Sequence, residues 1–448
     1  MADPSRVTRR RVIGWLALAG VTTFAAAAPS LEEAVRTWTI PDSPNGLHST
    51  QNWHALGRID GGDIIVAGMD HATNSALFRL AVGSDILEFI GDARSASEAA
   101  NNWQPGETAQ KFHTRPTALR NGMTYVATLD HSAIDDGYLK RRGFHWYGIA
   151  TGGRGPLIDL SADAPGGTAI EHGGLATLAA DPERGLLWGA TIPDARLIRY
   201  EPESNTTTDL GRPPAFGPGY SYTGRVIWVA PDGKVYFTGG NPAWGQKEPP
   251  EIFAHVHFFD PAAGEFGERR DWKLVEPRAI EMGQWNSDRT RCYFADDLGR
   301  VYRFNVEGPS WEQLGALAHD GRWVWVMHLS ADGRSIYFVN SGAPRDALFE
   351  FDIATGSTRH LAFLDDLHPN LKGRTRHTGH DTWDGEGRFY FTSFPWPAET
   401  DLLLTRVDPV RLKVATELLP ELVDGRDYRT GDSHLARIDS VAIPERSP

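Results

Sequence analysis

The chain has 448 residues and carries 45 Lys and Arg against 58 Asp and Glu, so its formal net charge is −13. An acidic surface argues against a nucleic-acid partner, because phosphate binding requires a basic footprint, but it allows an anionic glycan at a locally basic cleft. The 47 glycines and the aromatic content are typical of a globular β-rich protein, which we expect to be a monomer. Cys292 is the single cysteine, so the chain can form no internal disulfide.

The first 28 residues are typical of an export signal. Residues 8–13 read TRRRVI, a twin-arginine pattern, and a short apolar run and an Ala-rich cleavage region follow. An ordinary Sec signal or a membrane anchor are the alternatives, but the run over 12–28 is short for a bilayer span. We therefore predict a Tat-type signal peptide at 1–28 and a periplasmic or secreted protein without membrane contact after cleavage.

A tight-turn signal followed by a β-branched or aromatic strand recurs seven times, at intervals of 44 to 63 residues. A second series of strands follows in phase, such as LIRYE from Leu197 and LFEFD from Leu348. Together they predict an all-β fold, a seven-bladed β-propeller with four antiparallel strands per blade, over 29–448 as one catalytic domain. A β-sandwich is the alternative, but its strands need not repeat in groups of four. The turns centre on Gly62, Gly122, Gly185, Gly233, Arg289, Gly333 and Gly387.

In a propeller the first strand of each blade lines the central channel, so the starts of these strands form a rim on one face. Counting back about nine to thirteen residues from each turn, a strand length plus slack, identifies the residues of that rim. Aromatic rings stack on pyranose faces, and His or Tyr can move protons, so the rim is interpreted as a sugar-binding surface. Its residues are Trp53, His54, His113, His172, Tyr220, Tyr222, Met282 to Trp285, Trp323, His377 and His380.

The segment from Lys111 to Tyr147 holds three histidines, His113, His131 and His145, and a basic run that ends at Arg142. If the turn at Asn121-Gly122 joins two antiparallel strands, His113 falls opposite position 130, beside His131. A single strand histidine is usually a satisfied polar contact, but three near one hairpin end predict one wall of an active site. Zinc is an alternative that no short His spacing supports. The basic run is expected to form a rim for an anionic polymer.

Tyr220, Tyr222 and Arg225 begin the fourth blade, and Arg presents a planar fork that matches a carboxylate. Packing between sheets is the alternative for each tyrosine. His255 and His257 alternate onto one face of a strand, and with Cys292 they form a weak candidate for a structural zinc site, since fewer than four ligands are evident. The alternative is two histidines and a buried thiol.

The motifs KFHT, NGMTYVATLDH and RRGFHWY resemble the second blade of seven-bladed polysaccharide lyases, the ulvan lyases and those acting on rhamnose-glucuronate linkages, to which propeller rhamnosidases are related. The resemblance implies a histidine pair at His113 and His131. It implies that Tyr222 and Arg225 are the other two site residues. Tyr220 is the alternative for the tyrosine, and Arg196 or Arg199 is the alternative for the cation. At the start of blade three, where the resemblance implies a tyrosine, this sequence has His172.

The expected reaction is β-elimination on a uronate of an acidic polysaccharide or oligosaccharide. Arg225 and His113 would hold the carboxylate, and His131 or Tyr222 would act as base and acid. No cofactor is required, and a structural Zn or Ca ion is possible. A hydrolase that removes terminal rhamnose with His54, or a non-catalytic propeller that binds a glycan or protein, are the alternatives. Further substrate-binding candidates are His145, His172, Tyr220, Arg142, Arg199, Trp323 and His377.

Overall fold

A computed structural model describes most of the chain from Leu31 onward. The predicted signal peptide, His131, Tyr220 and Tyr222 lie outside the described residues, as do Lys140 and Arg141 of the basic run. The described ranges are 31–59, 61–70, 72–129, 142–150, 155–192, 194–216, 224–239, 254–277, 279–296, 298–317, 323–341, 346–372, 376–394 and 401–418, with 323, 341, 376–381 and 416–418 described by backbone alone.

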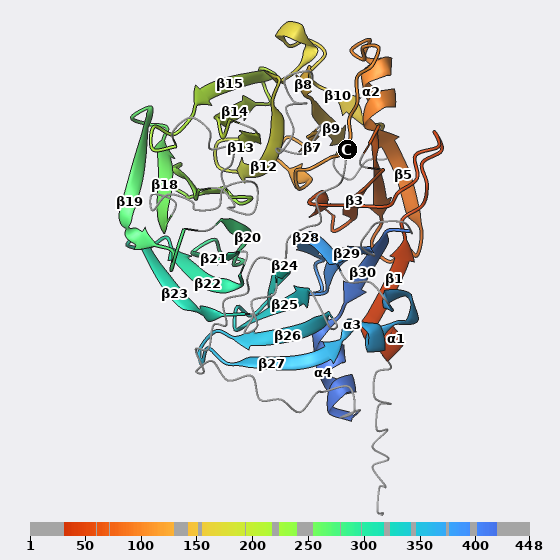
Figure 1. Ribbon diagram of the computed structural model, residues 1–448, viewed down its shortest axis with the longest axis vertical. Coiled ribbons are helices and arrows are strands. Elements are labelled where there is room, and N and C mark those ends of the chain that lie inside the picture. Colours follow the sequence, from red (N-terminus) through yellow and green to blue (C-terminus); the bar gives the residue numbers. More distant parts are fainter. Residues whose placement is uncertain are drawn as a thin grey trace, which may run out of the picture.

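Within these ranges the strands form seven four-stranded antiparallel sheets arranged as blades around a channel (Figure 1). The predicted seven-bladed β-propeller is confirmed. Blade one contains β2 (Leu56–Arg58), β3 (Ile64–Met69), β4 (Ser75–Leu80) and β5 (Leu87–Asp92), and blade two contains β6 (Thr117–Ala118), β7 (Met123–Ala127), β9 (Trp146–Ala150) and β10 (Ile158–Asp159). Blade three contains β12 (Gly174–Asp181), β13 (Leu186–Ile192), β14 (Leu197–Glu201) and β15 (Thr206–Gly211), and blade four contains β16 (Trp228–Val229), β17 (Val235–Phe237), β18 (His255–Asp260) and β19 (Glu265–Lys273).

The remaining blades follow the same order. Blade five contains β20 (Ile280–Trp285), β21 (Arg291–Asp296), β22 (Arg300–Asn305) and β23 (Ser310–Ala316), and blade six contains β24 (Trp323–Leu329), β25 (Ser335–Ser341), β26 (Ala347–Asp352) and β27 (Thr358–Phe363). Blade seven contains β28 (Arg376–Trp383), β29 (Phe389–Phe394), β30 (Leu403–Val407) and β1 (Val35–Thr39). A short pair, β8 (Gly143–Phe144) with β11 (Ile170–Glu171), and the helices α1 (Leu31–Ala34), α2 (Ala93–Ala99), α3 (Leu364–Leu367) and α4 (Pro409–Leu418), with the 3-10 turns Pro165–Gly167 and Pro369–Leu371, lie outside the blades. None of the helices in the described ranges is long and apolar enough to cross a membrane.

The ring is closed by its first strand. β1 pairs antiparallel with β30, from Val35 opposite Val407 to Thr39 opposite Leu403, so it becomes the outer strand of blade seven (Figure 1). The repeat pattern did not predict this closure, because β1 carries no turn signal of its own. Joining the two ends of the repeat in one sheet protects edges that an open array would expose.

The core consists of the interfaces between blades. A separate cluster of buried apolar side chains fills each interface between neighbouring blades around the ring. Trp146 packs between blades two and three, Trp188 between blades three and four, and Trp228 between blades four and five. Large rings suit these positions because flat sheets facing each other leave wide, shallow spaces.

The seven predicted hairpin turns join the first and second strands of the blades, and each has a residue with positive φ at the predicted position. In the blade-two hairpin the strand register differs from the prediction. Phe112 pairs with Thr128, and the His113 N–H donates to the Ala127 carbonyl, so His113 lies opposite Ala127 and not opposite position 130. In the same hairpin β6 pairs with β7 so that Thr117 lies opposite Tyr125. An irregularity between this pair and the pair of Phe112 with Thr128 shifts the register.

Candidate functional site

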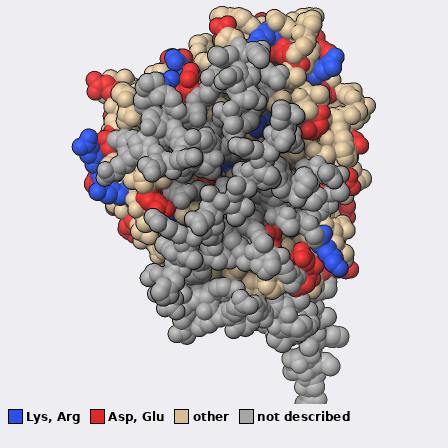
Figure 2. Space-filling model, in the orientation of Figure 1, with Lys and Arg blue, Asp and Glu red and all other residues tan. Residues whose placement is uncertain are grey.

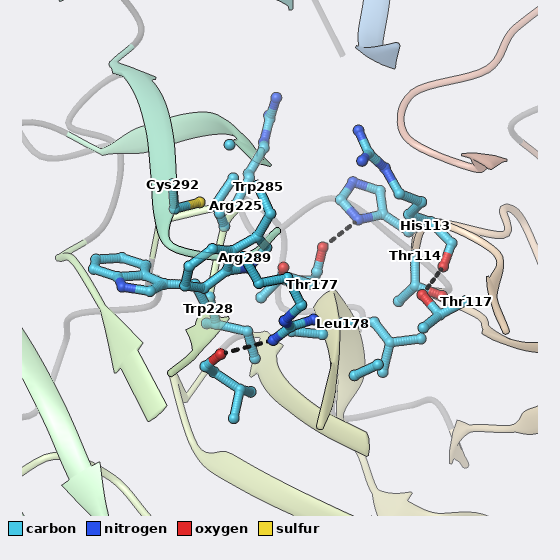
Figure 3. A pocket seen from close by; sticks show the side chains of 18 residues that line it. His113, Thr114, Thr117, Thr177, Leu178, Arg225, Trp228, Trp285, Arg289 and Cys292 are labelled. Carbon is cyan, nitrogen blue, oxygen red and sulfur yellow. Dashed lines mark hydrogen bonds between the residues drawn. The ribbon is translucent and has the colours of Figure 1, made fainter. Parts of the chain in front are cut away.

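A pocket of about 200 Å³ lies in the channel beside blades two to five. It is lined by His113, Arg115, Arg225, Trp285 and Arg289, among others. Two of the four predicted catalytic residues are described, His113 and Arg225, and both line this pocket. Figure 3 shows His113 on one side of it and Cys292 on the opposite side, with Arg289 between them.

His113 is held rigidly in the pocket wall. Only 3% of the residue is exposed, and its Nδ1 is 2.9 Å from the Ala176 carbonyl of blade three. A carbonyl can only accept, so Nδ1 carries the hydrogen of this bond. The ring of His54 meets it edge-on, with 4.3 Å between centroids. Two imidazoles from the first strands of blades one and two therefore meet at the channel.

Arg225 forms a buried ion pair across the boundary between blades four and five. Its Nε lies 3.2 Å from Glu281 Oε2, and 2% of each side chain is exposed. The guanidinium also lies 4.8 Å from the ring centroid of Trp325. Glu281 offsets the charge of Arg225, so the pair contributes orientation and hydrogen-bonding capacity more than net charge. Arg115 and Arg289 are the remaining cations of the pocket lining.

A second cavity, of about 650 Å³, continues the first toward the face that carries the hairpin turns. The two share Arg115, Gly283, Trp285 and Arg289, and the second adds Arg58. The prediction placed Trp285 on the rim where the first strands start. That is wrong, because Trp285 ends β20 and lies directly before the turn of blade five.

His145 lies outside the channel, in a dense polar cluster that fixes the segment before blade two. Its Nδ1 is 2.8 Å from Asp159 Oδ2, and its Nε2 is 2.9 Å from Glu107 Oε1. Burial alone would lower the pKa of His145, but hydrogen bonds and charges from both carboxylates outweigh burial and raise the pKa to about 9. His145 is therefore a charged structural group near neutral pH, not a residue that touches a ligand in either channel cavity.

Arg142 belongs to the same cluster and does not form the predicted rim. Its guanidinium bonds to the Glu107 carboxylate, to the backbone and side-chain oxygens of Asn102, and to the Gly166 carbonyl. Only 17% of the side chain is exposed. The sequence pattern suggested an anion-binding surface because it shows the cations of this segment but not the distant Glu107 that pairs with one of them.

Several other predicted substrate-binding residues lie away from the two cavities. His172 precedes β12 with φ 58°, is exposed, and has its Nε2 3.6 Å from Glu171. Arg199 lies on β14, the third strand of its blade, and pairs with Glu201 at 2.6 Å. Third strands lie outward of the channel, and neither His172 nor Arg199 lines either cavity. Trp323 and His377 lie on the channel strands β24 and β28, as predicted, with backbone alone described.

The predicted zinc ligands are not brought together. His255 bonds to Glu268 at 2.7 Å, while His257 contacts the rings of Phe216 and Phe237. Cys292 packs in the cluster on the other side of the blade-four sheet, and burial raises the pKa of its thiol well above the usual value. No group of three His, Cys, Asp or Glu side chains within the described ranges could hold a metal ion.

The sequence interpretation missed Glu281 and Arg289. Glu281 lies on the first strand of blade five, and only the neighbouring blade shows that it faces Arg225. For Arg289 a signal was present, because it occupies the one turn that has no glycine at the central position. The described rim of the face in Figure 2 carries acidic and basic groups interspersed. Arg58, Arg115 and Arg289 line one cavity of the channel.

The fold and the site together define a seven-bladed β-propeller whose channel holds a cationic and aromatic pocket. No protein-family model and no curated protein matches the sequence. A chain of the mitotic checkpoint complex has a similar structure, with a TM-score of 0.51 and 10% identity over 89% of this chain and 99% of that chain. Identity this low shows the fold alone.

Two sugar-related or extracellular proteins are also similar in structure. An extracellular domain from a candidate one-component system of B. thetaiotaomicron has a TM-score of 0.48 and 12% identity over 82% of this chain, which spans 39% of the length of that protein. A candidate 6-phosphogluconolactonase from Bacteroides uniformis has a TM-score of 0.48 and 11% identity, over 77% of this chain and 92% of that chain. Neither match assigns a reaction.

Proposed function

We propose that the protein is a secreted polysaccharide lyase that cleaves a uronic-acid glycan by β-elimination in the channel. The observation that carries the proposal is the shared pocket of His113 and Arg225. These residues lie far apart in the sequence and on different blades, yet both were expected beside the uronate. A pocket that combines an imidazole, three guanidinium groups and an indole has the chemistry to hold a sugar carboxylate.

In the proposed reaction a base removes the proton at C5 of the uronate. The electron pair forms the C4–C5 double bond, the bond from C4 to the glycosidic oxygen breaks, and an acid protonates the departing oxygen. The C5 proton is weakly acidic while the carboxylate is ionised, so the site must offset the developing negative charge. His131 and Tyr222 remain the proposed proton-transfer pair, and no step requires a cofactor.

The described residues refine how the carboxylate would be held. Arg225 is already offset by Glu281, so its expected role is to orient the substrate by hydrogen bonds. Arg115 and Arg289 line the same pocket and would supply further guanidinium donors to the carboxylate. A protonated His113, with Nδ1 anchored on Ala176, would present Nε2–H as a second donor.

The test is a spectroscopic assay on a broad panel of uronate glycans, including ulvan and gum arabic. The unsaturated uronate absorbs in the ultraviolet, so activity should raise the absorbance. Replacing His113→Asn should lower kcat by about 10²- to 10³-fold, as expected when one charge-stabilising donor is lost. His48→Asn is the matched control, because His48 is an exposed histidine that pairs with Asp42 outside the channel.

Thermal melting by circular dichroism accompanies both variants. A His113→Asn protein that melts like the wild type and retains full activity would contradict the assigned site. A panel that gives no absorbance rise with the wild type would contradict the lyase itself. Products that lack the double bond would favour the rhamnose hydrolase, for which His54→Ala becomes the informative variant.

A further inference from the structure

One hairpin turn differs from the other six around the channel. The central residue of every turn between first and second strands has positive φ, from 57° to 95°. It is glycine in six blades, and in blade five it is Arg289 with φ 57°. A side chain in this conformation brings its Cβ close to the backbone, which costs free energy that glycine avoids. Strained non-glycine residues cluster at functional sites, so the strain at this channel mouth suggests a function for the Arg289 side chain.

The Arg289 side chain is directed into the channel and held there by two contacts. Its Nη2 donates to the Val229 carbonyl of blade four at 3.2 Å, and the guanidinium carbon lies 5.0 Å from the ring centroid of Trp285 (Figure 3). The side chain lines both the 200 Å³ pocket and the 650 Å³ cavity. Arg289 therefore marks the point where the two spaces join.

Other side chains at this end of the channel can also bind a sugar that carries an anionic group. Four residues before the central turn residue, each blade places one side chain at the same depth of the channel. In blades one, five and seven these side chains are Arg58, Trp285 and Trp383, and all three line the larger cavity. Both indoles are partly exposed, and Arg58 is exposed. Aromatic faces stack on pyranose rings, and guanidinium groups bind carboxylate or sulfate groups in a planar fork.

The carboxylates around this mouth are engaged locally. Asp384 bonds to Arg388 Nε at 2.6 Å, and Asp332 caps its own turn through Ser330. Asp288 bonds to Thr290 within the blade-five turn. Hydroxyl donors do not cancel a charge, so Asp288 and Asp332 stay ionised beside the arginines of this mouth. Within the described ranges, the ion pairs within 4.0 Å do not include Arg58 or Arg289, so both guanidinium groups retain charge for a ligand.

We infer that the turn-side mouth of the channel is a binding site for an acidic saccharide unit, with Arg289 and Arg58 on its carboxylate or sulfate and Trp285 and Trp383 on its ring faces. This site adjoins the pocket of the proposed lyase and shares Arg289 and Trp285 with it, but binding there does not require that the protein be a lyase. It extends the ligand path through the channel, because Arg115 and Trp285 border both cavities.

The test is calorimetric titration with three probes: trigalacturonate, its neutral counterpart maltotriose, and sodium sulfate. The variant is Arg289→Gly, which gives blade five the residue that the other six turns use. Because glycine suits the positive φ, the melting temperature should hold or rise, while the Kd for trigalacturonate should rise by about tenfold or more, as expected for one lost charge-assisted contact. Arg120→Gly is the matched control, since Arg120 lies exposed beside the turn of blade two and outside both cavities.

The following results would overturn the inference. They are no trigalacturonate binding by the wild type at millimolar concentration, an unchanged Kd in Arg289→Gly, an equal loss in Arg120→Gly, and tighter binding of sulfate than of trigalacturonate. Maltotriose is expected to bind more weakly than trigalacturonate, and equal binding would also contradict a site for an acidic sugar. The lyase proposal is tested by absorbance and not by binding, so either idea can fail without the other.

Discussion

Two histidines of blade two, His113 and His145, are both buried but have opposite surroundings. His113 bonds to a neutral carbonyl and lines a cavity, whereas His145 lies between two carboxylates and lines neither of the two channel cavities. The first lies in the wall of a pocket that a ligand could enter. The second is fixed in its charged form, because losing its proton would leave Glu107 and Asp159 facing each other. Burial alone does not distinguish a functional imidazole from a structural one; the partners do.

The same contrast separates the arginines. Arg142 is held by a carboxylate and several oxygens of the outer cluster, and Arg225 is offset by Glu281. Arg289 is held by a carbonyl and an indole, which orient its guanidinium without cancelling its charge. Arg289 therefore keeps its charge for a ligand, whereas Arg225 is expected to contribute oriented hydrogen bonds and Arg142 supports the fold.

Glu281→Gln should produce the largest loss of stability. It removes the buried carboxylate that faces Arg225, so the free energy of unfolding should fall by about 3–5 kcal/mol. Denaturant titration measures the change. The double variant Arg225→Met with Glu281→Leu should be more stable than Glu281→Gln, because it removes both charges. A double variant as unstable as the single one would show that the ion pair is not the reason.

Raising the pH should destabilise the protein through His145. Its pKa rises from 6.5 to about 9 on folding, so its stabilising contribution is fully present below pH 6.5 and is lost as the pH rises through 9. The loss should amount to about 3 kcal/mol, from 1.36 kcal/mol per pKa unit. Urea titrations at pH steps across this window measure it. His145→Gln should remove this slope, and an unchanged slope in the variant would assign it to another group.

Arg142→Lys tests whether Arg142 supports the fold or belongs to the predicted anion-binding rim. Lysine cannot reproduce the guanidinium contacts to Asn102 and Glu107, so the free energy of unfolding should fall by about 1–2 kcal/mol. Affinity for an acidic glycan, measured by titration, should stay the same because Arg142 is engaged within the fold. A weaker affinity with unchanged stability would restore Arg142 to the binding surface.

The smallest expected effect is a gain in stability. Arg289→Gly relieves a left-handed residue, so the free energy of unfolding should rise by up to about 1 kcal/mol, reduced by the loss of the Val229 and Trp285 contacts. Denaturant titration beside the wild type measures it. A loss above about 1 kcal/mol would mean that Arg289 is required for folding, which would weaken its assignment to binding.

Local sequence patterns were enough to predict the propeller, its seven blades and the positions of its seven turns. These features depend on turn chemistry and strand patterning that repeat along the chain. The sequence also predicted that His113 and Arg225 lie at the channel, and both line its pocket just before the first strands of blades two and four. Only the tertiary structure decided which charges are cancelled. Glu281 faces Arg225 from the next blade, and Glu107 reaches Arg142 and His145 across the end of blade two. Such pairings join residues on separate elements, so no local pattern encodes them, and they determine which predicted cations remain available to a ligand.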